Sequence, residues 1–97
     1  MYMMISKFQF RQAMSPELVA QTEREVVDPL TQQPGFRAYY ACRSSETEIT
    51  TVHVWDSEAA AHNAVRTVSP QVQRVLGPEL VGSVERTGGE IEVHRHG

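Results

Sequence analysis

The sequence predicts an α+β fold in which the elements follow the order βαββαβ and form a four-stranded antiparallel sheet with both helices on one face. Three observations predict it: a β-like segment before a capped helix, a hairpin pattern in mid-chain, and a second capped helix before a last strand. Right-handed crossover connections place both helices on the same face. With 97 residues, the chain has the length of one domain, spanning 1–97 with a C-terminal tail at about 88–97.

The first strand and helix have clear sequence signals. Met4–Phe10 nearly alternates between apolar and polar residues, which predicts a strand. Ser15 can cap the following helix, with Pro16 at its first position, where the missing N–H is tolerated. Pro29 is expected to kink or end this helix, and Pro34-Gly35 to form a turn.

A β-hairpin is predicted in mid-chain, with strands over Phe36–Arg43 and Glu48–Trp55 joined by residues 44–47. A simple four-residue loop pairs Phe36 with Trp55, Ala38 with His53, Tyr40 with Thr51 and Arg43 with Glu48. Alternation then puts one set of side chains on one face: Phe36, Ala38, Tyr40, Cys42, Ile49, Thr51, His53 and Trp55. The other face holds Arg37, Tyr39, Ala41, Thr50, Val52 and Val54.

A second helix is predicted from Glu58, capped by Asp56-Ser57. Ser69-Pro70 should restart a short helical turn that Gly77-Pro78 stops. A last strand is predicted over 80–86, interrupted at Gly88-Gly89. Alternation resumes over 90–94, which predicts an edge strand that pairs with, or reaches toward, a second subunit.

A homodimer is predicted because both faces of the hairpin carry apolar or aromatic residues. The helices can cover only one face of the sheet, and an uncovered antiparallel face is normally polar. A large exposed apolar surface usually marks an interface. A two-fold dimer that packs sheet against sheet would bury it.

Charge and composition argue against several other partners. The formal net charge is −3, and the basic residues form no cluster, so neither nucleic acid nor an anionic membrane is expected. The apolar start, Met1–Ile5, is too short for a signal peptide or a membrane span. A single cysteine, Cys42, allows no internal disulfide, which fits a cytoplasmic location.

Two motifs carry a family resemblance. Pro34-Gly35-Phe36 follows the capped helix, and the hairpin ends in Trp55-Asp56-Ser57-Glu58. This pattern resembles the antibiotic biosynthesis monooxygenase-like domain of the dimeric α+β barrel superfamily, which has a ferredoxin-like topology. The resemblance covers about 4–86. It implies a homodimer whose two sheets close into a barrel and, in active members, a pocket between each sheet and its own helices.

The family contains cofactor-free oxygenases acting on phenolic or quinol substrates, heme-degrading enzymes, and many members without known activity. The heme-degrading branch uses an asparagine on the first strand with tryptophan and histidine on the second helix. Here the one asparagine is Asn63 and the one tryptophan, Trp55, ends a predicted strand. Heme degradation is therefore not expected, and neither is any other cofactor. His62 lies about two residues early for a histidine that many members carry on the second helix.

His53 is the candidate catalytic residue, because imidazole titrates near neutral pH and could take a proton from a phenol or enol. Tyr40 and Trp55 share its predicted face and are candidates for binding a small aromatic substrate. The alternatives are a hydrogen-bonded core or interface histidine for His53, and a packing anchor for Trp55.

The other candidates have weaker functional signals. His94 and His96 share one side of the tail without a third ligand, so no metal site is expected, and Cys42 is expected to be buried. Three functions stay open: a cofactor-independent monooxygenase-like enzyme, a non-catalytic binder of an apolar ligand, and a structural dimer module. A cavity of a few hundred cubic ångströms that includes His53 would favour the enzyme, and a filled core the structural module.

Overall fold

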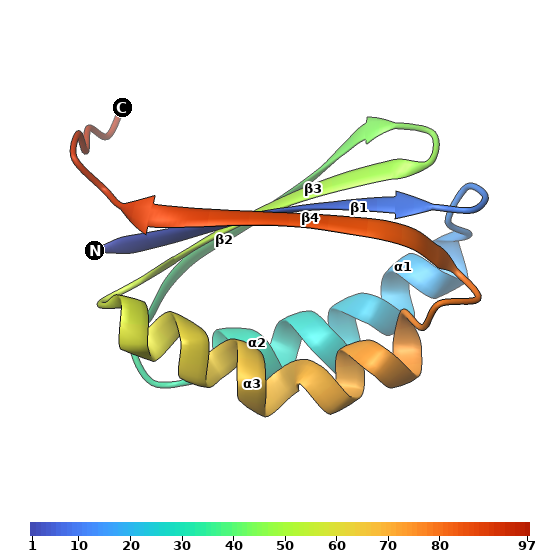
Figure 1. Cartoon of the computed structure of the whole chain (residues 1–97), viewed down its shortest axis with the longest axis horizontal. Coiled ribbons are helices and arrows are strands. Elements are labelled where there is room, and N and C mark those ends of the chain that lie inside the picture. The colour runs from blue at the N-terminus through green and yellow to red at the C-terminus, as the bar shows by residue number, and fades with distance from the viewer.

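A sheet and a layer of helices face each other in the computed structural model, which describes all 97 residues (Figure 1). The sheet is four-stranded and antiparallel, with strand order β2-β3-β1-β4, and both helical segments cover the same face. The predicted α+β fold is thus confirmed. No helix has the length and apolar character needed to cross a membrane. The strands are β1 (Tyr2–Phe10), β2 (Phe36–Ser45), β3 (Glu48–Trp55) and β4 (Val81–Glu90).

The first helical segment begins as predicted and consists of three consecutive elements: α1 (Pro16–Thr22), the π-helical η1 (Glu23–Val27) and α2 (Asp28–Thr31). Ser15 caps it, because the Leu18 N–H donates to Ser15 Oγ at 3.1 Å. The chain also stays helical through Pro29, which was expected to kink or end the helix.

The π-helical turn explains how Pro29 is accommodated. Proline has no N–H, and in an α-helix its ring crowds the carbonyl four residues earlier. In η1 the hydrogen bonds span five residues, since the Asp28 N–H donates to the Glu23 carbonyl. The wider turn just before Pro29 relieves that crowding. Such π-turns often occur near functional sites.

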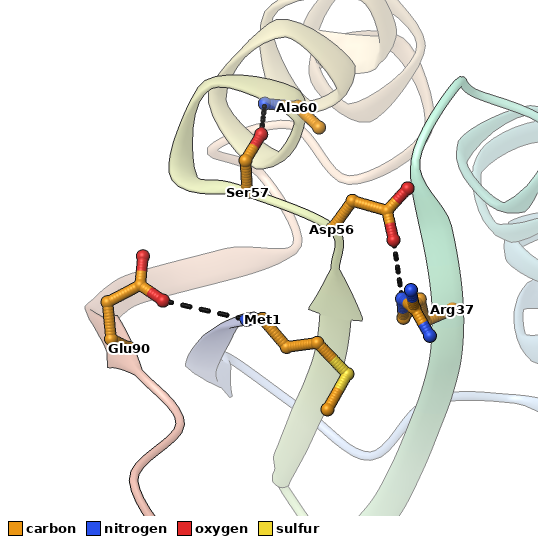
Figure 2. Close-up of polar contacts among 6 residues, drawn as sticks. All are labelled: Met1, Arg37, Asp56, Ser57, Ala60 and Glu90. Carbon is orange, nitrogen blue, oxygen red and sulfur yellow. Dashed lines mark hydrogen bonds and ion pairs between the residues drawn. The ribbon is translucent and has the colours of Figure 1, made fainter.

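The second helix, α3 (Glu58–Val75), is continuous. Ser57 caps it by accepting a hydrogen bond from the Ala60 N–H at 3.1 Å, as Figure 2 shows. The expected restart at Ser69-Pro70 is wrong, because Pro70 lies inside the helix. Buried residues occur on both sides of this proline: Ala61, Ala64, Val68 and Val75. Burial of this common apolar face outweighs the lost hydrogen bond.

The start of β2 is tied to the start of α3. Gly35 has φ +86°, and a Cβ there would lie 2.8 Å from the Ala60 Cβ, so the predicted turn needs glycine for both conformation and space. The Asp56 N–H donates to the Gly35 carbonyl at 2.8 Å. Asp56 also forms an ion pair with Arg37 (Figure 2).

The hairpin register differs from the simple prediction by one residue. Phe36 pairs with Trp55 as expected, but irregularities follow between Phe36 and Ala38 and between Arg43 and Ser45. These bulges leave an extra residue in β2 at each place. In between, Tyr39 pairs with His53 and Ala41 with Thr51. Strand β2 also runs on to Ser45, so Glu48 pairs with Ser45 and not with Arg43.

A slip of one residue exchanges the two faces of a strand. Tyr39 and Ala41 therefore share the helix-facing side with His53, while Ala38 and Tyr40 share the outer side with Val54 and Val52. The predicted faces of β3 are right, and those of β2 after the first bulge are wrong.

The last strand passes through Gly88-Gly89 without interruption. A Cβ on Gly88 would lie 2.6 Å from the Tyr2 hydroxyl, so glycine gives the Tyr2 side chain room to lie against β4. Residues 91–97 are not a strand, so the predicted edge strand over 90–94 is wrong. Instead, the Ile91 N–H donates to the Met1 carbonyl at 2.8 Å, and Glu90 pairs with the terminal amino group (Figure 2).

Candidate functional site

A cavity of about 480 Å³ lies between the sheet and the helices. This volume is within the usual range for sites that bind small molecules. Hydrophobic side chains make up 16 of its 24 lining residues. The apolar wall on the helix side includes Val19, Val26, Val27, Leu30, Val65, Val68, Val72 and Leu76.

The sheet side of the cavity carries a polar strip across all four strands. In one row, Ser6 on β1 pairs with Thr51 on β3 and with Arg86 on β4. In the next row, His53 on β3 pairs with Tyr39 on β2. All five residues line the cavity. Antiparallel pairing thus brings together polar groups from distant parts of the chain on one patch of an otherwise apolar site.

His53 is buried, with 5% of its surface exposed, and its ring is oriented by a neighbouring indole. The Trp55 Nε1–H donates to His53 Nδ1 at 2.6 Å. Burial, aided by the positive charge of Arg86, lowers the pKa of His53 to about 4. The imidazole is therefore neutral at physiological pH.

Tyr39 forms the other support of the imidazole. Its ring stacks on His53 with centroids 6.0 Å apart and an angle of 12° between planes. Burial raises the pKa of the Tyr39 phenol, so this group stays protonated at neutral pH. Sequence reasoning assigned this place to Tyr40.

Arg86 is a cavity-lining residue that the sequence did not reveal. Its side chain lines the cavity and takes part in none of the ion pairs or side-chain hydrogen bonds of the structure. Arg86 is an exposed residue at the border of the cavity, and a guanidinium cannot lose its proton in a protein, so a permanent cation in contact with solvent lies beside the apolar cavity. The sequence holds one signal for this position of Arg86. The residue lies near the end of the last predicted strand, and alternation puts its side chain on the same side of that strand as the apolar Val84.

The three residues predicted for the site have different positions. His53 lines the cavity, which is the position that the catalytic hypothesis requires. Tyr40 does not, because the register slip turns it to the outer face, where it is 69% exposed. Trp55 is fully buried, does not line the cavity, and packs edge-on against Phe36 with ring centroids 5.5 Å apart. Trp55 therefore has the packing role that was the alternative to substrate binding, and it also donates a hydrogen bond to His53.

The remaining sequence candidates have different positions. Cys42 borders the cavity but is exposed, contrary to the expected burial. His94 and His96 lie in the tail with ring centroids 4.4 Å apart, and the structure contains no group of three or more metal-binding side chains.

The lowered pKa of His53 predicts that the protein becomes less stable in acid. An unfolded histidine has a pKa near 6.5, so the unfolded chain binds the extra proton first as the pH falls. Stabilisation from the neutral ring is complete above about pH 6.5 and is lost toward about pH 4, by up to about 3 kcal/mol. His53→Gln should flatten this part of the stability curve, which urea unfolding at pH 7.5, 5.5 and 4.5 would measure. Parallel curves for both proteins would contradict the burial effect.

Comparisons with known proteins agree with this architecture. The model of the antibiotic biosynthesis monooxygenase family matches residues 1–75. SnoaB, a cofactor-independent oxygenase from Streptomyces nogalater, has a similar fold, with a TM-score of 0.77, 16% identity, and coverage of 96% of this chain and 94% of that one.

Two further solved structures have the same fold. A candidate antibiotic biosynthesis monooxygenase from Chloroflexus aurantiacus gives a TM-score of 0.69 at 20% identity, covering 99% of this chain and 96% of that one. The protein NE2512 of unknown function from Nitrosomonas europaea gives 0.74 at 10% identity, covering 99% and 93%. A search of curated sequences finds no match. Because the family model covers most of the chain, the protein belongs to the antibiotic biosynthesis monooxygenase family.

Proposed function

We propose that this protein is a cofactor-independent monooxygenase that oxidises a small phenolic or quinol-type ring inside the cavity, and that it acts as a homodimer. The observation that carries the proposal is the polar strip within an apolar cavity of about 480 Å³, where the cation of Arg86 lies close to the neutral His53. SnoaB, which has a similar fold, is described as a cofactor-independent oxygenase, and this supports the proposed reaction class by analogy.

The reaction requires an electron-rich anion and a dry pocket. An ionised phenol or enol can transfer an electron to O₂, after which a carbon–oxygen bond forms at the activated ring carbon. For a ring CH₂ group, one oxygen atom becomes the new carbonyl and the other leaves as water with the two hydrogens. O₂ is thus the oxidant, and no separate reductant is needed.

Arg86 and His53 would assist this chemistry in different ways. Arg86 would stabilise the substrate anion, which lowers the pKa of the bound phenol and promotes loss of its proton to water. His53 would contact the same oxygen through Nε2, the nitrogen that Trp55 leaves free. The sequence suggested that His53 takes the proton, but a histidine with a pKa of about 4 is a weak base at neutral pH.

The apolar wall would hold the ring and exclude water. Aliphatic side chains from η1, α2 and α3 face the polar strip across the cavity, among them Val26, Leu30 and Val68. Low polarity around a charged oxygen strengthens its attraction to Arg86. The open volume also argues against a purely structural module, for which a filled core was expected.

Oxygen uptake with a panel of anthrone-like and quinol substrates tests the proposal. The unmodified protein should consume O₂ and form the carbonyl product in a ratio of one to one. His53→Ala should reduce turnover by about 10²-fold or more, as expected for removal of one donor to a charged oxygen. His94→Ala, which changes a tail histidine outside the cavity, is the matched control and should leave turnover unchanged.

Absence of O₂ uptake with every substrate would contradict the enzymatic role. If the same compounds still bound, for example by quenching the fluorescence of Trp55, the non-catalytic binder would replace it. Equal turnover of His53→Ala and the unmodified protein would show that His53 takes no part in the reaction.

A further inference from the structure

Trp55 is the only side chain that hydrogen-bonds to His53, and the geometry of this pair has a chemical consequence. Both residues are on β3, two positions apart, so both side chains point toward the helices. The donor nitrogen is Trp55 Nε1 and the acceptor is His53 Nδ1, at 2.6 Å. Trp55 is 0% exposed and His53 is 5% exposed, so water does not compete for this bond.

An indole N–H can donate a hydrogen bond but cannot accept one. Nδ1 of His53 must therefore present its lone pair to Trp55. In the neutral ring the proton then sits on Nε2, the nitrogen that makes no bond to the protein. The other tautomer, and also the protonated ring, would place an N–H at Nδ1 directly against the indole N–H.

Packing holds the Trp55 indole in place, so the position and direction of its N–H are fixed. It packs edge-on against Phe36 at an angle of 72° and belongs to the core cluster with Leu30, Ala61 and Ala64. On the imidazole, Trp55 approaches edge-on and Tyr39 stacks. The His53 ring can therefore neither rotate freely nor exchange its two nitrogens without loss of contacts.

The charged and titratable groups around the cavity leave this assignment intact. Besides His53, the lining contains Tyr39, Cys42 and Arg43 from β2, Arg86 from β4, and Glu23 and Asp28 from the first helical segment. None of them hydrogen-bonds to the imidazole. Arg86 disfavours a second positive charge on the ring.

We propose that Trp55 is a positioning residue that fixes His53 as the Nε2–H tautomer, so that the cavity presents a hydrogen-bond donor, and not a base, to the substrate. This inference rests on the proposed function only in placing the substrate in this cavity. It narrows the substrate class: the atom that meets His53 must accept a hydrogen bond, so it is an ionised phenolic or enolic oxygen or a carbonyl oxygen. A neutral hydroxyl that needs an acceptor would not be matched there.

Nitrogen-15 NMR of histidine-labelled protein tests the tautomer without any substrate. Nδ1 and Nε2 of neutral imidazole have well separated shifts that depend on which one carries the proton. The unmodified protein should show a single Nε2–H form of His53 at pH 7. An Nδ1–H form, an even mixture or a protonated ring in the unmodified protein would overturn the proposal, and this result does not depend on the folding of any variant.

Trp55→Phe removes the N–H and keeps an aromatic ring in the core. We expect a mixture of tautomers and a rise in the pKa of His53 of about 0.5–1 unit, as expected for loss of one hydrogen bond to the neutral form. Phe36→Leu is the matched control, because it alters the packing on the indole and keeps the N–H, so it should retain the single tautomer. Equal tautomer populations in both variants would overturn the role of the hydrogen bond.

The pH dependence of kcat/KM distinguishes a positioning role of Trp55 from a merely structural one. In Trp55→Phe kcat/KM should fall only above the pKa of His53, where the neutral ring can lose the Nε2 proton to the other tautomer, whereas a general loss of structure would lower kcat/KM at every pH alike. If the tautomer result holds and no substrate is consumed, the proposed enzymatic function fails and the positioning role stands. If substrates are consumed while His53 of the unmodified protein has mixed tautomers, the proposed enzymatic function stands and the positioning role of Trp55 fails.

Discussion

Val52→Asp should convert the proposed homodimer into monomers. Val52 lies in the middle of β3, an inner strand, and alternates with the cavity-lining His53, so it lies on the sheet face opposite the helices. No helix covers this face (Figure 1). Its row on this face contains Tyr40 and Ile5, and the next row contains Val54 with Met3 and Ala38. Tyr40 is exposed and the other five residues of these rows are half-buried, and an apolar surface of this kind is unusual for a protein that stays monomeric.

The register correction strengthens the case for a partner on this face. It moves Tyr40 from the cavity side to the outer side, where 69% of this large aromatic residue is exposed. Tyrosines are enriched in interfaces because the ring is apolar and the hydroxyl can bond to the partner. A carboxylate at position 52 would be buried without a partner in a packed dimer, which costs several kcal/mol in each copy. Such a cost should raise the dimer dissociation constant by at least about 10³-fold.

Sedimentation velocity at micromolar concentration measures the outcome. The unmodified protein should sediment at about twice the chain mass, and Val52→Asp at the mass of one chain with its circular dichroism retained. Val93→Asp is the matched control, because Val93 is 76% exposed in the tail and receives the same charge. A monomeric unmodified protein, or a variant that dimerises equally well, would contradict the sheet-to-sheet dimer.

The parts of the fold that could be predicted from sequence are those with local chemical signals. Ser15 and Ser57 cap helices because their hydroxyls accept backbone N–H groups, and both were recognised from their place before a helical pattern. Gly35 could be placed because a left-handed φ excludes most other residues. These signals depend on neighbours in the chain and not on distant packing.

The errors come from effects that distant residues decide. Pro70 looks like a helix break until the burial of α3 on both sides is known, and Gly88 looks like a strand break until Tyr2 lies against it. The bulges in β2 have no reliable sequence signal, yet each changes which side chains face the helices. For adjacent tyrosines, Tyr39 and Tyr40, one extra residue decides which of them reaches the cavity.

The candidate site was half predictable for the same reason. His53 could be identified because an imidazole in an apolar strand is unusual, whether it is catalytic or part of the core. The alternating pattern of β3 also predicts the sheet face on which the His53 side chain lies. Arg86 required knowledge that β4 pairs with β1 in a register that sets Arg86 beside Ser6. The cavity itself depends on how the helices pack over the sheet, which a hydrophobic pattern does not encode.

Arg86→Met should abolish most of the turnover while preserving the fold. Methionine keeps an unbranched apolar chain at this position and removes the charge. In the proposed reaction the substrate must become an anion in an apolar cavity, and Arg86 is the cavity cation nearest to His53 in the sheet rows. Removing a group that stabilises developing negative charge lowers kcat by about 10²–10³-fold. The pKa of His53 should rise in the same variant, because the nearby positive charge is gone.

Arg66→Met is the matched control for this change. Arg66 is exposed on α3, outside the cavity lining, so its replacement removes the same net charge without touching the site. Arg86→Lys should recover part of the activity, because an ammonium supplies the charge but not the planar pair of donors. O₂ uptake and binding of an ionised phenol, each measured at low and high salt, would compare the three variants. Full activity in Arg86→Met, or an equal loss in Arg66→Met, would show that the cavity does not act through a substrate anion held by Arg86.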